Sequence, residues 1–474
     1  IIARSVTVDA YGDVSVVIAL VTLSVTVATI GFTQGIPRYM SRFQDEADVR
    51  GAWVTGFVIS GILGVTIAGA WLAASAIVGP ALLDRSAPAS LLVPFVLAIP
   101  LMTGLRIGIS GIRGLENTVY RTYTRDLVYP LSRIGLVGGL LVLGYGIVAV
   151  GYAYLLAAAI GAVLGVVLLN RLIRLRGPVT LRPREMLTFS APLVVSSVLS
   201  VLLMRTDTVM LGYFRPAREV GLYGSAYPLA GSLVIILASF GYLYLPVASR
   251  LDADVERETL DRIYTLTTKW IYIIAFPVVL LFASFPTDVL RIVFGSRYAG
   301  AWPALVILTV GFFTNAAGGR NRETLSALGK TPHVLGINAV AFALNVGLNL
   351  VLIPRYGFVG AAVASAMAYG TINGLAVVVL RWTAGITPFS RRSFRTFVIL
   401  PVCLLPPTIL LAPRVSLTPG TLPIVMVGLA AVTLVTVTIS GCLQPEDRIV
   451  LEFFEDRTGV TVPFVRGFLP EGSR

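Results

Sequence analysis

The chain has 474 residues, of which 56% are hydrophobic and only 13% charged, and its mean hydropathy is +0.85. A soluble protein of this length has about a quarter of its residues charged, so the composition excludes a soluble globular protein. With two cysteines and one histidine, His333, the sequence has no disulfide framework, His-based metal site or Ser-His-Asp triad, so we expect neither an enzyme nor a bound cofactor.

Apolar stretches follow one another from Tyr11 to Gly441, and many are long enough to cross a bilayer, which takes about 20 residues. The segment IIARSV (1–6) is typical of the end of an earlier span. We therefore predict an all-α polytopic membrane protein of about fourteen transmembrane helices, the first of them truncated. The other thirteen windows are 13–37, 51–79, 88–111, 122–144, 147–170, 188–212, 221–247, 264–285, 301–325, 334–353, 357–380, 394–412 and 420–441.

The spans repeat after about 212 residues. Tyr11-Gly12 opens a span in the first half as Tyr223-Gly224 does in the second, and YGIVAV (145–150) matches YGFVGA (356–361). Duplicated bundles are a common architecture of secondary transporters. The repeat predicts two pseudo-symmetric six-helix bundles and two additional C-terminal helices. The predicted boundaries are 1–172 for the first bundle, 173–186 for a cytoplasmic linker, 187–382 for the second bundle, 383–441 for the extra helices and 442–474 for a cytoplasmic tail.

The net charge of +13 is concentrated in alternate loops. Arginines gather at 38–50, at 171–184, at 250–262 and at 391–395, while the loops between these carry few. This is the positive-inside pattern, which predicts that the basic loops and both termini are cytoplasmic, in a multi-pass protein of the cell membrane. The charge is therefore explained by topology, and we expect no nucleic-acid partner.

Charged residues at helix depth point to a polar interior, because each costs roughly 2.5–3.5 kcal/mol on insertion scales. Arg106 and Arg113 share a helical face, and Asp126 and Arg133 have the same spacing. The repeat aligns Arg320 and Arg322 with Arg106, and Asn338 and Asn345 with Asp126 and Arg133. We expect all eight to line a substrate cleft. Snorkelling of the arginines, interhelical hydrogen bonds of the asparagines and a local Arg320–Glu323 pair are the structural alternatives.

Asp207 and Arg205 complete the candidate site. They are two residues apart, on opposite sides of their helix, so they cannot form a local ion pair. We expect Asp207 to bind a coupling H⁺ or Na⁺ or to face a basic residue across the cleft, with a purely structural role as the alternative. Two nearby tyrosines, Tyr223 and Tyr227, suit the interfacial aromatic belt better than a saccharide surface.

Two segments carry a family resemblance: ARSVTVDAYGDVSVVIALVTLSVTVATIGFTQGIPRYMSR (3–42) and DTVMLGYFRPAREVGLYG…PVASRL (207–251). The first looks like the opening of the oligosaccharide flippase (polysaccharide transporter) family, and the second is the stronger match to that family. The resemblance extends to about residue 380 and implies membership of the multidrug/oligosaccharidyl-lipid/polysaccharide exporter superfamily. It implies translocation of a lipid-linked oligosaccharide or polyprenyl-phosphate sugar by alternating access, for polysaccharide or glycan assembly.

The resemblance also implies partners: the lipid-linked glycan, membrane lipids, and a glycan polymerase or glycosyltransferases. A cation-coupled multidrug or metabolite exporter of the same superfamily is the alternative, and it predicts an acidic or aromatic cavity. A membrane scaffold for glycan-assembly enzymes would need no charge in a cavity. Because intramembrane arginines outnumber acids, the sequence favours the flippase.

Overall fold

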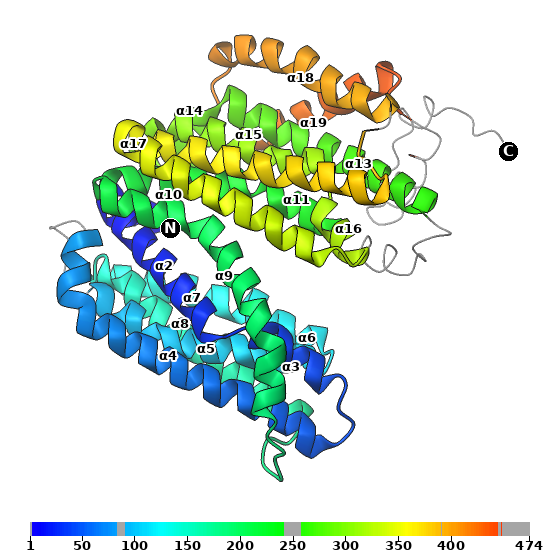
Figure 1. Cartoon of the computed structure of the whole chain (residues 1–474). Helices are drawn as coiled ribbons and strands as arrows, with labels where there is room; N and C mark the ends of the chain where they lie inside the picture. The colour runs from blue at the N-terminus through cyan, green and yellow to red at the C-terminus, as the bar shows by residue number, and fades with distance from the viewer. Residues whose placement is uncertain (1, 83–90, 241–256, 390, 444–446, 448–474) are drawn as a thin grey trace. The chain divides into compact units, whose positions relative to one another are not determined.

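The computed structural model describes residues 2–82, 91–240, 257–389, 391–443 and 447. Every regular element within these ranges is a helix, which confirms the all-α prediction (Figure 1). Contacts divide the chain into two compact units. The first contains Ile1–Gly224 and Asn349–Phe358, and the second contains Ser225–Leu348 and Val359–Arg474. The bundle boundaries predicted from the repeat stay a prediction.

The first unit consists of long helices, and short turns or breaks divide several of them. Its elements are α1 (Ile2–Ser5), α2 (Val8–Ala28), α3 (Phe32–Met40), α4 (Glu46–Leu82), α5 (Leu92–Gly114), α6 (Thr118–Thr122), the π-helix η2 (Tyr123–Val128), α7 (Tyr129–Val142), α8 (Val148–Leu172), α9 (Pro183–Phe214) and the start of α10 (Ala217–Gly231).

The second unit begins within α10. It continues with α11 (Leu233–Ser239), α13 (Arg257–Ser284), α14 (Pro286–Val293), the 3₁₀-helix η3 (Ser296–Ala301), α15 (Trp302–Gly318), α16 (Asn321–Ala327), most of α17 (Thr331–Ala384), α18 (Arg391–Leu411), the 3₁₀-helix η4 (Ala412–Arg414) and α19 (Leu422–Ile439). Except for residues 442, 443 and 447, the predicted tail lies outside the described residues.

Eleven helices among the described residues are long and apolar enough to cross a membrane, so the chain is a polytopic membrane protein. Two predicted windows fall within α17, which turns at Gly357. The window at 122–144 falls on η2 and α7, where a π-helical turn separates α6 from α7. The total of fourteen transmembrane helices stays a prediction.

The first span is broken near its end. Thr7 caps α2 by accepting a hydrogen bond from the Ala10 N–H at 3.2 Å, and the helix ends at Ala28. Ile30 and Gly31 then adopt positive φ angles of 42° and 75° before α3 begins. A Cβ at position 31 would lie 2.4 Å from the Ser190 carbonyl oxygen, so only glycine allows α9 to approach this break.

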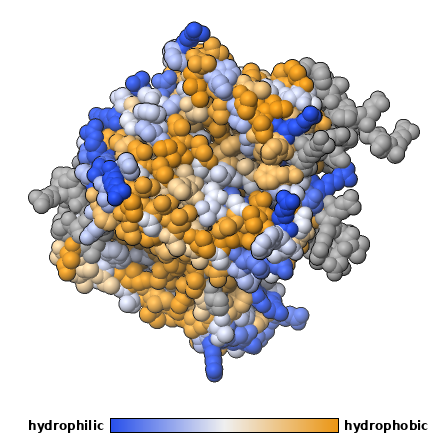
Figure 2. Space-filling model, turned by 45° about the horizontal axis from the view of Figure 1, so that its top comes forward, coloured by the Kyte–Doolittle hydropathy of each residue, from blue (hydrophilic) through white to orange (hydrophobic). Residues whose placement is uncertain are grey.

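The helices of the first unit pack around a buried core and expose apolar side chains on the outside. Helix α5 packs against α4 and α8, which lie beside it in Figure 1. The buried side of α4 contributes Trp53 to the core, whereas Ile62 and Val65 are more than 60% exposed. Figure 2 shows wide apolar areas on one face of the molecule. In a membrane protein, such exposed apolar side chains contact lipid.

The repeat is visible in the backbone at two aligned glycines. Gly146 precedes α8 with a φ angle of 56°, and Gly357 divides α17 with a φ angle of 59°. At Gly357, a carboxylate from elsewhere in the sequence caps the second half of α17. Glu219 accepts a hydrogen bond from the Phe358 N–H at 2.9 Å, and Arg215 holds the other Glu219 oxygen at 2.8 Å. All of these residues belong to the first unit, so the turn of α17 is attached to that unit.

The two aligned glycines allow a matched test of this cap. We expect Gly357→Ala to lower the free energy of unfolding more than Gly146→Ala. Both variants carry a backbone cost of about 1–3 kcal/mol at positive φ. Only at position 357 would the new Cβ lie 1.8 Å from Glu219 Oε2, because nothing lies within 4 Å at position 146. Thermal unfolding of both variants in detergent measures the difference, and equal losses would contradict the role given to Glu219.

Candidate functional site

Arg106 lies inside the first unit, on α5. Eight residues separate it from the end of the helix at Gly114, a rise of about 12 Å. Its Nη1 donates a hydrogen bond to the Thr26 hydroxyl of α2 at 3.0 Å. The side chain is partly buried. It therefore binds a neighbouring helix within the unit, instead of extending along α5 to its end.

Arg133 projects from α7 between aromatic rings. Its Nη1 donates a hydrogen bond to the Tyr154 hydroxyl of α8 at 2.9 Å. The guanidinium lies 4.9 Å from the centroid of the Tyr154 ring and 5.6 Å from that of Tyr129. Two aromatic faces within about 6 Å stabilise the cation by cation–π interaction.

Tyrosines connect these arginines with a third, Arg205 of α9. Tyr129 lies under Arg133, as given above, and within electrostatic range of Arg106. Arg205 lies within electrostatic range of Tyr154 and of Tyr11 of α2. The side chains come from five helices, α2, α5, α7, α8 and α9. We call Arg106, Arg133, Arg205, Tyr11, Tyr129 and Tyr154 the arginine–tyrosine cluster.

The cluster has positive charge without matching negative charge. Six other described arginines pair with carboxylates: Arg50, Arg125, Arg182, Arg215, Arg291 and Arg320. Arg106, Arg133 and Arg205 form no ion pair with any described residue. The buried Tyr129 hydroxyl also lacks a well-formed hydrogen bond to any described group. The cluster therefore offers cations and a hydroxyl donor to a ligand, and that ligand would be an anion.

Two predicted site residues lie outside this cluster. Arg113 is exposed in the last turn of α5. Asp126 is 56% exposed in η2 and lies 3.6 Å from Arg125. The prediction that Asp126 and Arg133 form one regular helical stripe is wrong. A π-helical turn has more residues than an α-helical one, so it shifts the faces of the helix out of register.

Asp207 is fully buried on α9. Its carboxylate accepts hydrogen bonds from the Tyr223 hydroxyl of α10 and from the Thr208 N–H, the latter at 2.7 Å. No ion pair joins Asp207 to Arg205 in the described structure, as their spacing predicts. The belt position predicted for Tyr223 is wrong, because the side chain is fully buried against Asp207.

In the second unit, the predicted arginine is stabilised within the protein. Arg320, which precedes α16, is buried, and its Nη1 donates to the Leu237 carbonyl at 2.8 Å. Its Nη2 lies 3.2 Å from Glu323, so the local pair expected as the structural alternative is present. Arg322 is partly exposed beside it. Asn338 and Asn345 are buried on the first half of α17, seven residues apart and so on one helical face.

Sequence reasoning missed several buried polar groups. Tyr11, Tyr129 and Tyr154 were available as polar aromatics within apolar windows, but only their contacts with arginines distinguish them from core residues. Lys269 of α13 is also buried, 2.5 Å from Asp447, in an ion pair that joins residues far apart in the sequence. No spacing rule predicts such pairs.

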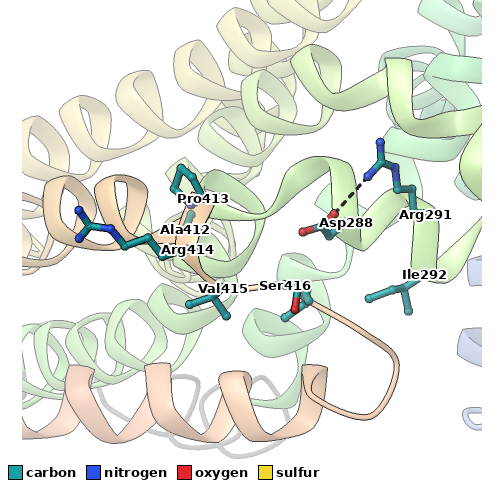
Figure 3. A pocket seen from close by; sticks show the side chains of 9 residues that line it. Asp288, Arg291, Ile292, Ala412, Pro413, Arg414, Val415 and Ser416 are labelled. Carbon is teal, nitrogen blue, oxygen red and sulfur yellow. Dashed lines mark ion pairs between the residues drawn. The ribbon is translucent and has the colours of Figure 1, made fainter.

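A pocket in the second unit contains none of the predicted site residues. Asp288, Arg291 and Ile292 of α14 line it together with residues 412–417 (Figure 3). Arg291 lies 3.6 Å from Asp288, and Arg414 points away from this pair. Because Arg291 is paired with Asp288 and Arg414 points away, this pocket does not present several unpaired positive charges to one ligand.

Two family models match the sequence. The model described as "Polysaccharide biosynthesis protein" matches residues 1–252, which is more than half of the chain. The model named MatE matches residues 192–351. The two matches overlap over residues 192–252, which include most of α9 and all of α10 and α11.

Curated relatives match over part of their length. The "Probable low-salt glycan biosynthesis flippase Agl15" of Haloferax volcanii is 24% identical over 273 residues, 58% of this chain and 57% of that protein. The "Uncharacterized membrane protein MJ1068" of Methanocaldococcus jannaschii is 28% identical over 191 residues, 39% of this chain and 37% of that protein. The chain thus spans about half, or less, of the length of these relatives.

Solved structures match the fold over most of the chain. "Lipid II flippase MurJ, inward closed conformation" superposes with a TM-score of 0.68 at 12% identity, covering 92% of this chain and 94% of that one. The inward-facing conformation of a multidrug resistance MATE family transporter gives a TM-score of 0.67 at 17% identity, covering 81% and 92%. At these identities the likeness concerns the fold alone.

The buried Asp207–Tyr223 contact is testable by a double-mutant cycle. We expect Asp207→Ala and Tyr223→Phe to destabilise the protein less in combination than the sum of their separate effects. The expected coupling is about 0.5–3 kcal/mol, the range for residues in direct contact. Unfolding of the wild type, both single variants and the double variant measures it. Strictly additive losses would show that this hydrogen bond does not hold α9 to α10.

Proposed function

The chain belongs to the polysaccharide biosynthesis protein family, and from this premise we propose that it is a flippase for lipid-linked oligosaccharide or polyprenyl-phosphate sugar. The observation that carries the proposal is the group of three arginines without carboxylate partners in the first unit. An uncompensated charge inside a membrane protein is costly, so it calls for a ligand of opposite charge. The phosphate of a lipid-linked sugar supplies that charge.

The chemistry of the cluster suits a phosphate or diphosphate. A guanidinium donates several N–H groups in a planar fork, which matches the oxygens of a phosphate. Hydroxyls of Tyr129 and Tyr154 add donors beside Arg133 and Arg106. We assign Arg106, Arg133 and Arg205 to binding of the phosphate. Arg113, Asp126, Arg320, Arg322, Asn338 and Asn345 stay predicted site residues.

The proposed mechanism is alternating access. The headgroup would bind to the cluster from the cytoplasmic side and leave on the outer side, while the lipid tail stays in the bilayer. The protein is proposed to lie in the cytoplasmic membrane. Its basic loops and both termini are proposed to face the cytoplasm. The glycan and membrane lipids are the proposed partners, and a glycan polymerase or glycosyltransferases remain predicted ones.

The multidrug alternative calls for a different interior. A cationic drug would need acidic or aromatic groups without excess positive charge. Arg106, Arg133 and Arg205 would repel such a cargo, so the anionic substrate is favoured. Export of a cationic dye without movement of lipid-linked sugar would reverse this choice.

Neutralising the cluster tests the function directly. We expect Arg133→Gln or Arg106→Gln to slow flipping of a fluorescent polyprenyl-phosphate sugar in proteoliposomes at least tenfold. A hydrogen bond to a charged group contributes about 1.5–3 kcal/mol, and tenfold corresponds to about 1.4 kcal/mol. Arg414→Gln is the matched control, because it removes an exposed arginine outside the cluster. Unchanged flipping by folded cluster variants would refute the assignment.

Coupling to an ion is a separate proposal, in which Asp207 binds H⁺ or Na⁺. We expect Asp207→Asn to make flipping independent of imposed H⁺ and Na⁺ gradients, because the amide cannot supply the negative charge that holds a cation. Flipping rates with each gradient imposed and collapsed measure this dependence. A folded variant that still responds to the gradient would leave Asp207 with its structural contact to Tyr223 alone.

A further inference from the structure

The three arginines of the arginine–tyrosine cluster lie at different levels of the first unit, and α5 measures the distance between two of these levels. Phe95 of α5 packs against Tyr154, with ring centroids 5.2 Å apart, and Tyr154 accepts the hydrogen bond of Arg133. Arg106 follows Phe95 by eleven residues, about 16 Å further along the helix axis. Arg133 is therefore held well away from Arg106, towards the N-terminal end of α5.

Helices α2 and α9 pack against each other in opposite directions. A Cβ on Gly31, just after α2, would lie 2.4 Å from the Ser190 carbonyl oxygen near the start of α9. A Cβ on Gly12, near the start of α2, would lie 1.9 Å from the carbonyl oxygen of Ala217, just after α9. The end of α2 therefore lies beside the start of α9, and the start of α2 lies near the end of α9.

This pairing places Arg205 at a third level. Thr26, the partner of Arg106, lies in the last turn of α2 and so near the start of α9. Arg205 follows Ser190 by fifteen residues, about 22 Å along α9. In α2, fifteen residues also separate Thr26 from Tyr11, which lies within electrostatic range of Arg205. Both helices thus put Arg205 about 22 Å from the level of Arg106.

One face of α2 carries hydroxyl groups over this distance. Successive members of this face are four or seven residues apart, which places them on one side of the helix. They are Tyr11, Ser15, Thr22 and Thr26. The first three are partly exposed. An anion that moves along α2 from Thr26 to Tyr11 therefore meets hydroxyl groups between the levels of the arginines.

Contacts hold two of the guanidinium groups at their own levels. Arg106 donates to the Thr26 hydroxyl at 3.0 Å, and Arg133 lies against the rings of Tyr129 and Tyr154. A single phosphate is far smaller than separations of about 16 to 22 Å along the helices. All three arginines are partly exposed, so each is accessible to a ligand. The arrangement suits three successive positions for an anion better than one position shared by all three arginines.

We propose that the phosphate crosses the first unit in steps, binding Arg106, Arg133 and Arg205 in turn beside the hydroxyl-bearing face of α2. This inference rests on the proposed function and adds an order of events to it. Arg106 is nearest the end of the unit that bears the arginine-rich loops, so it is the first step from the cytoplasm. A charge that moves about 22 Å through a medium of low dielectric constant faces a high barrier, and a cation at each level lowers that barrier.

Equilibrium binding distinguishes successive positions from one shared site. The probe is a fluorescent polyprenyl-phosphate sugar, added to the purified protein in detergent. We expect at most one of Arg106→Gln, Arg133→Gln and Arg205→Gln to weaken binding more than about threefold, because the phosphate still binds at the two remaining arginines. The flipping rate should nevertheless fall at least tenfold in each variant, since every step lies on the path. Arg414→Gln, which removes an exposed arginine of the second unit, is the matched control for both measurements.

The outcomes separate this inference from the proposed function. If two or all three variants weaken binding about tenfold, the arginines hold one phosphate together, and the steps are wrong while the proposed function stands. Unchanged flipping by folded Arg205→Gln would also overturn the steps. If the wild type neither binds nor flips the probe, the proposed function fails, and this inference fails with it.

A second set of variants covers a failure to fold. Should a glutamine variant not fold, Arg106→Lys, Arg133→Lys or Arg205→Lys replaces it at that position. Lysine keeps the positive charge and removes the planar fork that matches a phosphate. The same result is expected from this set: at most one variant weakens binding more than about threefold, and two or more would overturn the inference.

Discussion

The low dielectric constant of the membrane interior governs this structure, because it makes an unpaired buried charge costly. Lys269 pairs with Asp447 and Arg320 with Glu323, and Arg320 also donates a hydrogen bond to the Leu237 carbonyl. Against this background, the unpaired Arg106 and Arg133 stand apart. Their energetic cost is tolerable when an anion binds, and a flippase for a phosphate-linked sugar meets that anion in every cycle.

The helices are interrupted at a few positions, and each interruption has a defined cause. Glycine with positive φ ends α2 and turns α17, and the π-helix η2 changes the face that α7 presents. Backbone groups freed by a break in a membrane need new partners. At Gly357 the partner is Glu219, which caps the second half of α17 from α10. Breaks of this kind let long helices bend without exposing polar backbone to lipid.

Much of the fold follows from the hydropathy of the chain. Apolar windows of about 20 residues coincide with helices, because a backbone in lipid must satisfy its hydrogen bonds within the segment. The repeat places positive-φ glycines at 146 and 357, since both open a helix after a turn. The prediction that Asp126 and Arg133 share one helix face was wrong for a local reason. A single π-helical turn is invisible to a rule that assumes 3.6 residues per turn.

Sequence alone determined that this protein lies in the membrane, that it is helical and that its spans repeat. These properties depend on local hydropathy, which is read from residue types. Tertiary structure decided which charges have partners. Tyr154 beside Arg133, Tyr223 beside Asp207 and Glu219 at the turn of α17 come from distant segments. Their contacts depend on how helices pack, and helix packing is not encoded in the spacing along any one helix.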